Sequence, residues 1–159
     1  MNNGLPEEIN GWKIYVHPCF ADVYEALVDE VEALKEKDPD GYKKKAPTKL
    51  LAVVHKVIET GIAVDPSSPA YRQGTTLGNE NKDWSRAKFG NGRYRLFFRY
   101  SSDKKVIILA WMNDSNTLRT YGSKSDSYKV FEKMLKKGKP PRDWATLLKE
   151  SKNDNDEKI

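Results

Sequence analysis

The sequence predicts an α+β fold: a small antiparallel sheet packed on an N-terminal helical hairpin, with further helices at the C-terminal end. Two observations predict it. Apolar residues recur at helical spacing before residue 62 and again after residue 126, and the stretch 84–112 has the alternation of strands. The 159 residues suffice for one hydrophobic core. We therefore expect one domain over residues 1–151 and a polar tail over residues 152–159.

The N-terminal part begins with a predicted strand, Trp12–Val16, and Pro18 then suits the first turn of a helix. That helix has an apolar stripe, an acidic outer face and an end near Asp38. A second helix, which Pro47 either begins or kinks, is expected to end at Gly61 as a left-handed cap. Its apolar positions are Leu50, Leu51, Val54, Val57 and Ile58.

Residues 62–81 are rich in Pro, Ser, Gly and Asn and predict a long irregular connection. Three strands are expected near 84–90, 93–101 and 105–112, since Gly and Asp-Lys turn signals separate them. The third is apolar on both faces, as a central strand covered by helices would be. Helices near 126–137 and from Asp143 complete the chain.

Composition excludes several classes of protein. No apolar run is long enough to span a membrane, and the first residues lack the pattern of a signal peptide, so we expect a cytoplasmic protein. Cys19 is the only cysteine, which excludes an intrachain disulfide. His17 and His55 are the only histidines, and we expect both to be structural. The sequence therefore predicts neither a metal site nor a cofactor.

Charge is divided along the chain. Residues 1–42 contain ten acidic and three basic residues, whereas residues 43–159 contain twenty-five basic and thirteen acidic ones. The densest basic stretch, 82–105, holds eight basic residues, two acidic ones and several aromatic ones. Basic clusters with interleaved aromatic residues are typical of nucleic-acid binding, although a solvated surface gives the same composition.

Strand alternation separates these charges from the apolar residues. In the middle strand the basic residues fall on one face, and the preceding strand repeats the division. We therefore expect five cations on one open sheet face: Arg86, Lys88, Arg93, Arg95 and Arg99. A polyanion would relieve their repulsion. The alternative is that some of the arginines lie over aromatic rings or pair with the acidic first helix.

Four stretches of the sequence carry a resemblance to a known family. They are Lys82–Tyr100, Gly11-Trp12, His17–Phe20 and Asn113–Gly122. Together they resemble the YhaV toxins, the toxins of type II toxin-antitoxin systems whose antitoxin is PrlF, and the resemblance covers nearly the whole chain. This family belongs to the RelE/ParE superfamily. The resemblance thus implies a RelE-like fold.

The resemblance implies an endoribonuclease that cleaves mRNA at the ribosome, inhibits translation and growth, and is neutralised by a PrlF-type antitoxin. The implied reaction is attack of a ribose 2′-hydroxyl on the adjacent phosphate, without a metal ion. Operator DNA would be a partner only through the antitoxin complex, and no membrane is involved. Two alternatives are a ParE-like gyrase inhibitor and a non-catalytic module that binds RNA or the ribosome.

Superfamily positions map onto three basic residues of the strands. Arg86 and Lys88 match the two basic residues of the first meander strand, and Arg95 matches the key arginine of the next one. RelE has a lysine where this chain has Arg86, so Arg86 is expected to clamp phosphate. Lys88 is the candidate for proton transfer.

Two further positions follow the last strand. Arg119 is the expected arginine, and either Tyr121 or Tyr128 is the expected tyrosine. Arg119 could instead bind the antitoxin, Tyr121 could mark only a turn, and Tyr128 could simply open the apolar face of its helix. Four more cations are candidates for RNA binding: Arg72, Lys82, Arg93 and Arg99.

Overall fold

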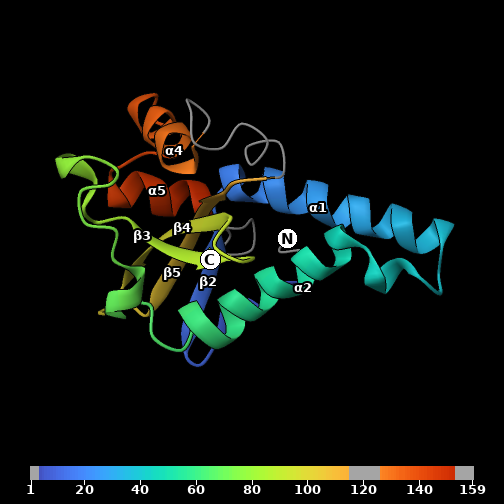
Figure 1. The fold of residues 1–159 in the computed structure, drawn as a ribbon. Coiled ribbons are helices and arrows are strands. Elements are labelled where there is room, and N and C mark those ends of the chain that lie inside the picture. Colours follow the sequence, from blue (N-terminus) through green and yellow to red (C-terminus); the bar gives the residue numbers. More distant parts are fainter. Residues whose placement is uncertain (1–3, 115–125, 153–159) are drawn as a thin grey trace.

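The computed structural model describes residues 4–114 and 126–152, and it has the predicted α+β architecture (Figure 1). The strands are β1 (Glu8–Ile9), β2 (Trp12–Val16), β3 (Ser85–Phe89), β4 (Tyr94–Ser101) and β5 (Val106–Met112). The main helices are α1 (Pro18–Lys37), α2 (Ala46–Val57), α4 (Ser127–Lys136) and α5 (Trp144–Ser151). No helix in these two ranges has the length and apolarity needed to cross a membrane.

The strands form one sheet in the order β1-β2-β5-β4-β3. The predicted β3–β4–β5 meander is antiparallel, and β5 is central, as expected. The pairing of β2 with β5 is parallel, however, so the sheet is mixed rather than wholly antiparallel. Strand β5 is buried on both faces and requires a neighbour on each side, and β2 supplies the second one.

Strand β1 was not predicted. It pairs with β2 through a turn in which Asn10 and Gly11 both have positive φ, at 53° and 84°. Asn-Gly is the preferred pair for a two-residue hairpin turn because both positions favour the left-handed region. The signal was therefore present in the sequence, but the strand before it is only two residues long.

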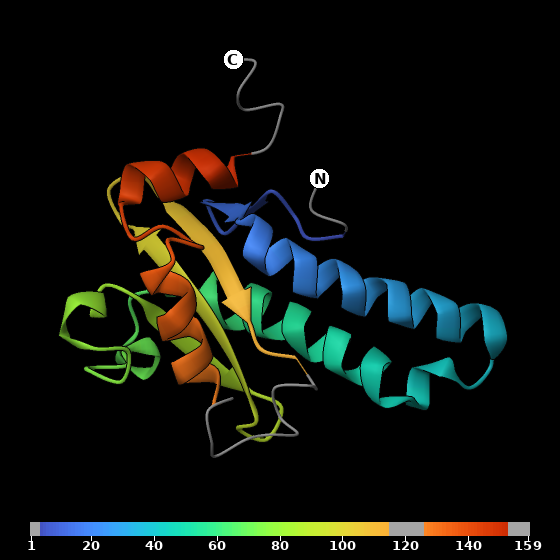
Figure 2. The same ribbon diagram turned by 90° about the horizontal axis from the view of Figure 1, so that it is seen from above.

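Helices α1 and α2 form the expected antiparallel hairpin, which extends away from the sheet (Figure 2). Helix α1 begins at Pro18, and the Nδ1 atom of its cap, His17, accepts a hydrogen bond of 3.1 Å from the Cys19 N–H. The Nε2 atom of His17 lies 2.8 Å from the Glu150 carboxylate of α5. His17 thus joins the start of α1 to the last helix, which is the structural role expected of it.

The end of the second helix differs from the prediction. Pro47 lies in the first turn of α2 and begins the helix without kinking it. Gly61 is not a left-handed cap, because it lies in a π-helical turn, Ile58–Ile62, and is absent from the described glycines with positive φ. A Cβ atom at Gly61 would lie 2.8 Å from the Tyr71 hydroxyl, so the glycine allows the close approach of Tyr71 and does not serve a special backbone conformation.

The connection over residues 62–81 is more ordered than predicted. It contains two short 3₁₀ helices, Pro69–Tyr71 and Asn79–Asn81. The buried Gln73 amide donates hydrogen bonds to the carbonyls of Asn81 (2.8 Å) and Trp84 (3.2 Å) and accepts one from the Leu77 N–H (3.1 Å). One side chain therefore organises the approach to β3, because buried backbone groups require partners.

The sheet separates two hydrophobic clusters. Leu96 and Phe98 face α1 and α2, whereas Phe97 faces α4 and α5, as the alternation predicts. The expectation of an open basic face is wrong, because α4 and α5 cover it. The ring of Phe131 in α4 stacks on Phe97 and Trp111 at centroid distances of 4.3 and 5.7 Å. Phe97, the apolar side chain among the cations of β4, thus provides a surface on which α4 packs.

A β-bulge explains how Trp111 joins this stack. Phe97 pairs with Trp111 and Phe98 with Leu109, so Ala110 is the extra residue of β5. Ala110 and Trp111 both contact the α4–α5 side, and alternation resumes with Met112 on the α1–α2 side.

The aromatic stack yields a stability prediction. Replacement of Phe131 by Ala removes a fully buried ring, and we expect the free energy of unfolding to fall by about 3–5 kcal/mol. Urea unfolding followed by tryptophan fluorescence measures this change. The control Lys129→Ala, on the exposed side of the same helix, is expected to stay within about 0.5 kcal/mol of the parent. Equal stabilities for the two variants would contradict the described packing.

Candidate active site

Three of the predicted site residues meet at one oxygen atom. The Tyr128 hydroxyl accepts hydrogen bonds from the Nε atoms of Arg86 (2.9 Å) and Arg95 (3.0 Å). These arginines come from β3 and β4, and Tyr128 comes from the first turn of α4. No ion pair joins either arginine to a carboxylate among the residues that the structure describes. We call Arg86, Arg95 and Tyr128 the Arg–Tyr cluster.

The guanidinium of Arg95 is held from several sides. Its Nη1 atom donates to the carbonyls of Gly92 and Tyr94, and the guanidinium carbon lies 5.5 Å from the centroid of the Tyr128 ring. Arg95 is only 8% exposed. Because its position is fixed by these contacts, little conformational entropy remains to be lost when an anion binds.

Asn113 fixes the backbone on which Arg95 sits. Its Oδ1 atom accepts from the Arg95 N–H at 2.7 Å, and its Nδ2 atom donates to the Arg93 carbonyl at 3.2 Å. Asn113 is buried and directly follows β5, so its amide continues the strand pairing. In the sequence, Asn113 was named only as the first residue of Asn113–Gly122, one of the stretches that resemble the toxin family. The available signal was a polar residue immediately after an entirely apolar strand.

Tyr128 is oriented by its own helix and by the sheet. The carboxylate of Asp126 caps α4 by accepting from the Tyr128 N–H at 2.8 Å. The Tyr128 ring meets Phe97 edge-on at a centroid distance of 5.7 Å. Tyr128 therefore packs on the sheet and also reaches the two arginines, and its catalytic role stays a prediction. Arg119 and Tyr121 lie outside the described residues.

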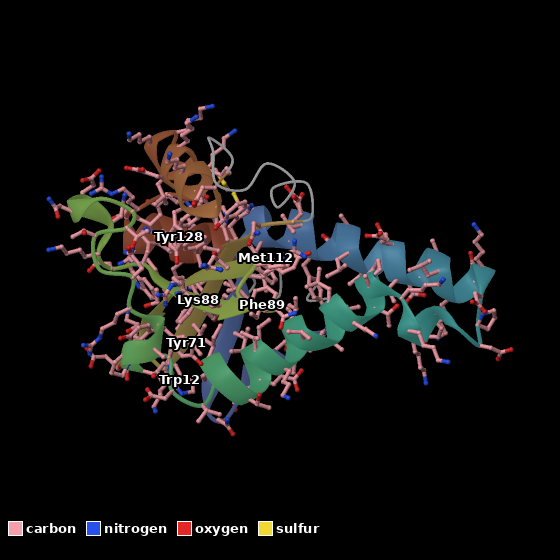
Figure 3. All side chains as sticks on the ribbon, viewed as in Figure 1. Trp12, Tyr71, Lys88, Phe89, Met112 and Tyr128 are labelled. Atoms are coloured by element: carbon pink, nitrogen blue, oxygen red, sulfur yellow. The ribbon has the colours of Figure 1, made fainter. Side chains whose placement is uncertain are left out.

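Lys88 lies beside the Arg–Tyr cluster. It pairs with Arg95 across β3 and β4, and it shares a strand face with Arg86 because the two residues are two positions apart. Its side chain is exposed, and it is labelled with Tyr128 in Figure 3. Arg86 also donates to the Ala70 carbonyl at 2.8 Å, which directs its guanidinium toward the edge of the sheet.

Arg99 lies on the predicted sheet face but outside the cluster, and the prediction of five cations on one face is wrong because Arg93 lines a groove on the opposite side of the sheet. Its guanidinium carbon lies 5.5 and 5.4 Å from the ring centroids of Trp84 and Trp144, and its Nη1 atom donates to the Arg142 carbonyl at 2.6 Å. Burial lowers the pKa of Arg99, and the Asp83 carboxylate opposes that shift. Arg99 therefore helps to attach α5 to the sheet, as the aromatic alternative foresaw.

The remaining candidates for RNA binding occupy two different places. Arg72 bridges to Ser85 at the start of β3, next to Arg86, and with exposed Lys82 it lines a cavity of about 340 Å³. Arg93 lies in the turn before β4 and is exposed. It lines a separate groove on the α1–α2 side. Arg72 and Lys82 therefore extend the basic surface along the β3 edge, and Arg99 lines the same cavity.

The chemistry available at the cluster is that of guanidinium, ammonium and phenol groups. Within residues 4–114 and 126–152, no three His, Cys, Asp or Glu side chains are grouped so that they could hold a metal ion. Two guanidinium groups aimed at one point can bind the oxygens of a phosphate and stabilise added negative charge there. The fold and the cluster thus define a small basic α+β protein with a pair of guanidinium groups of the kind that can bind phosphate.

Comparisons with known proteins identify the family of this chain. Residues 14–152 match the YhaV toxin family, described as toxins with endonuclease activity of toxin-antitoxin systems. The chain is 67% identical over 148 residues to the "Ribonuclease toxin YhaV" of Escherichia coli K12, which covers 92% of this chain and 96% of that protein. "Toxin YhaV" of Escherichia coli O157:H7 and of Escherichia coli O6:H1 match with the same identity and coverage. No solved structure matches. The chain belongs to the YhaV toxin family.

The contacts of Asn113 predict an effect on catalysis. In Asn113→Ala the backbone of Arg95 loses its side-chain partner, and we expect kcat for an RNA oligonucleotide to fall about tenfold while KM changes less than twofold. Single-turnover and steady-state cleavage assays, run well below the unfolding temperature, measure this. The control Ser102→Ala alters an exposed turn at the other end of β4 and should cleave like the parent. An unchanged kcat in Asn113→Ala would contradict the positioning role.

Proposed function

We propose that this endoribonuclease toxin cleaves mRNA without a metal ion, in association with the ribosome, and so inhibits translation and growth. The proposed antitoxin is of the PrlF type, the proposed location is the cytoplasm, and operator DNA is contacted only through the antitoxin complex. The observation that carries this proposal is the convergence of Arg86 and Arg95 on one oxygen atom with no carboxylate among the described residues paired to either.

The geometry suggests how a phosphate enters the Arg–Tyr cluster. In the structure the Tyr128 hydroxyl accepts both Nε–H groups, as a non-bridging phosphate oxygen would. An anionic oxygen is the stronger acceptor, so RNA competes with the phenol for the two guanidinium groups. The Tyr128 hydroxyl is then available for a hydrogen bond or a proton transfer to the reacting atoms.

The proposed reaction forms a bond between the ribose 2′-oxygen and the adjacent phosphorus and breaks the bond to the 5′-oxygen. The products are a 2′,3′-cyclic phosphate and a 5′-hydroxyl. Arg86 and Arg95 stabilise the charge of the pentavalent phosphorane. Lys88 and Tyr128 are the described groups within reach of the proton transfers, one from the 2′-hydroxyl and one to the 5′-oxygen. Arg119 and Tyr121 remain candidates from the sequence.

Arg72 and Lys82 extend the proposed RNA path along the edge of β3. Both line the cavity next to Arg86, and both are exposed. Contacts of this kind act through release of counterions, so they contribute affinity that falls as salt concentration rises. They hold the RNA along one side of the cluster without selecting its sequence.

Arg95 provides the first test. We expect Arg95→Ala to lower cleavage of mRNA at least about a hundredfold and to abolish growth arrest, because charge stabilisation of the phosphorane is lost. Primer extension on mRNA, with and without ribosomes, measures cleavage. Circular dichroism and antitoxin binding verify the fold, and Lys104→Ala in an exposed turn is the control. Absence of new 5′ ends with the parent protein in both conditions would remove the nuclease proposal.

Tyr128 provides the second test. Tyr128→Phe keeps the ring that packs on Phe97 but removes the oxygen that both arginines contact. We expect cleavage to slow at least about tenfold with little change in the unfolding temperature, since only the polar role is lost. A variant that cleaves at the parental rate would show that Tyr128 serves packing alone and would favour Tyr121.

A further inference from the structure

A groove opens on the side of the sheet opposite the Arg–Tyr cluster. It lies between the α1–α2 hairpin, the turn that joins β3 to β4, and the end of β5, and its volume is about 570 Å³. Met112, labelled in Figure 3, marks the end of β5 at this place. We call it the hairpin groove. None of the three residues of the Arg–Tyr cluster lines this groove.

The floor of the hairpin groove is apolar and its rim is acidic. Val23, Ala26 and Leu27 of α1 line it together with Leu50 of α2 and Met112. Among the described residues, the charged ones that line it are Asp22, Glu30, Asp114 and Arg93. Burial raises the pKa of the Tyr94 phenol in the groove wall. Arg93 opposes this rise, while Asp114 and Glu30 reinforce it, which locates these charges around one hydroxyl.

This balance of groups disfavours RNA as the occupant. Three carboxylates against one guanidinium repel a phosphate backbone, and the acidic outer face of α1 continues the same charge. A partner that fits the groove would place apolar side chains against its floor and cationic side chains at its rim. A polypeptide segment with apolar residues on one side and lysine or arginine on the other has both.

We propose that the hairpin groove binds an amphipathic, basic segment of the antitoxin. The inference rests on the proposed function, because membership of a toxin-antitoxin system supplies the protein partner. The choice of segment rests on charge complementarity with Asp22 and Glu30 at the rim. A cavity of this size accommodates a few apolar side chains, which is how buried anchors contribute to an interface.

The groove is connected to the Arg–Tyr cluster through the backbone. Arg93 and Tyr94 line the groove and directly precede Arg95, while Met112 and Asp114 line it on either side of Asn113. Asn113 holds the backbone of both Arg93 and Arg95. A segment bound in the groove therefore contacts the backbone next to Arg95 from the α1–α2 side of the sheet. It leaves the proposed RNA-binding face on the other side uncovered.

Matched pairs of variants test the docking surface. Glu30→Lys reverses a rim charge and Ala26→Trp fills the floor, and both positions are exposed on α1. The controls are Glu25→Lys, on α1 outside the groove, and Ala52→Trp, on the exposed face of α2. Isothermal titration calorimetry with a purified PrlF-type antitoxin measures Kd. We expect at least tenfold weaker binding for the two groove variants and parental Kd for the controls.

Cleavage of RNA without antitoxin is measured for all four variants and is expected to match the parent, since none of these residues belongs to the cluster. Parental Kd for both groove variants would overturn the docking surface, as would equal weakening by Glu25→Lys. If the groove variants instead change the oligomeric state of the free toxin, a second copy occupies the groove and the proposal is wrong. Absence of RNA cleavage by the parent protein would contradict the proposed function, and it is read independently of Kd.

Discussion

The shared acceptor at Tyr128 is the constraint on which the site depends. A single phenol oxygen holds Arg86 and Arg95, which repel each other, at the same place. That arrangement requires α4 to lie on the sheet, and the stacking of Phe131 on Phe97 and Trp111 keeps it there. The packing of one aromatic stack thus sets the position of the two guanidinium groups, and stability and chemistry are coupled through one helix.

The sheet also separates two electrostatic environments. The first 42 residues are strongly acidic and form β1, β2 and α1, whereas the rest of the chain is basic. Folding places the acidic rim of the hairpin groove behind the sheet and the Arg–Tyr cluster in front of it. Two partners of opposite charge can then approach from opposite sides of the sheet. This division explains how a protein of modest net charge can present a strongly cationic site.

Local patterns predicted most of the secondary structure, because amphipathic helices and alternating strands depend on neighbouring residues. The parallel pairing of β2 with β5 was missed since it joins segments about ninety residues apart. The cover over the basic face was missed although Phe97 interrupts the row of arginines. For the site, strand alternation placed Arg86 and Arg95 among the cations and the resemblance to a toxin family singled them out, but the role of Asn113 depends on where β5 ends in space. The alternation of β4 could not show that Arg99 contacts Trp84 and Trp144, because neither ring belongs to that strand.

The bulge at Ala110 has a consequence for how this chain tolerates changes in length. Because Ala110 is the extra residue, removing it would place Leu109 directly before Trp111 and restore regular alternation, and both residues would keep their partners on β4. Trp111 would stay in the aromatic stack, Met112 would stay on the side of the groove, and Asn113 would keep its register with Arg95. This strand can therefore lose one residue at the bulge while its pairing is kept, whereas a deletion at Met112 would displace either Trp111 or Asn113.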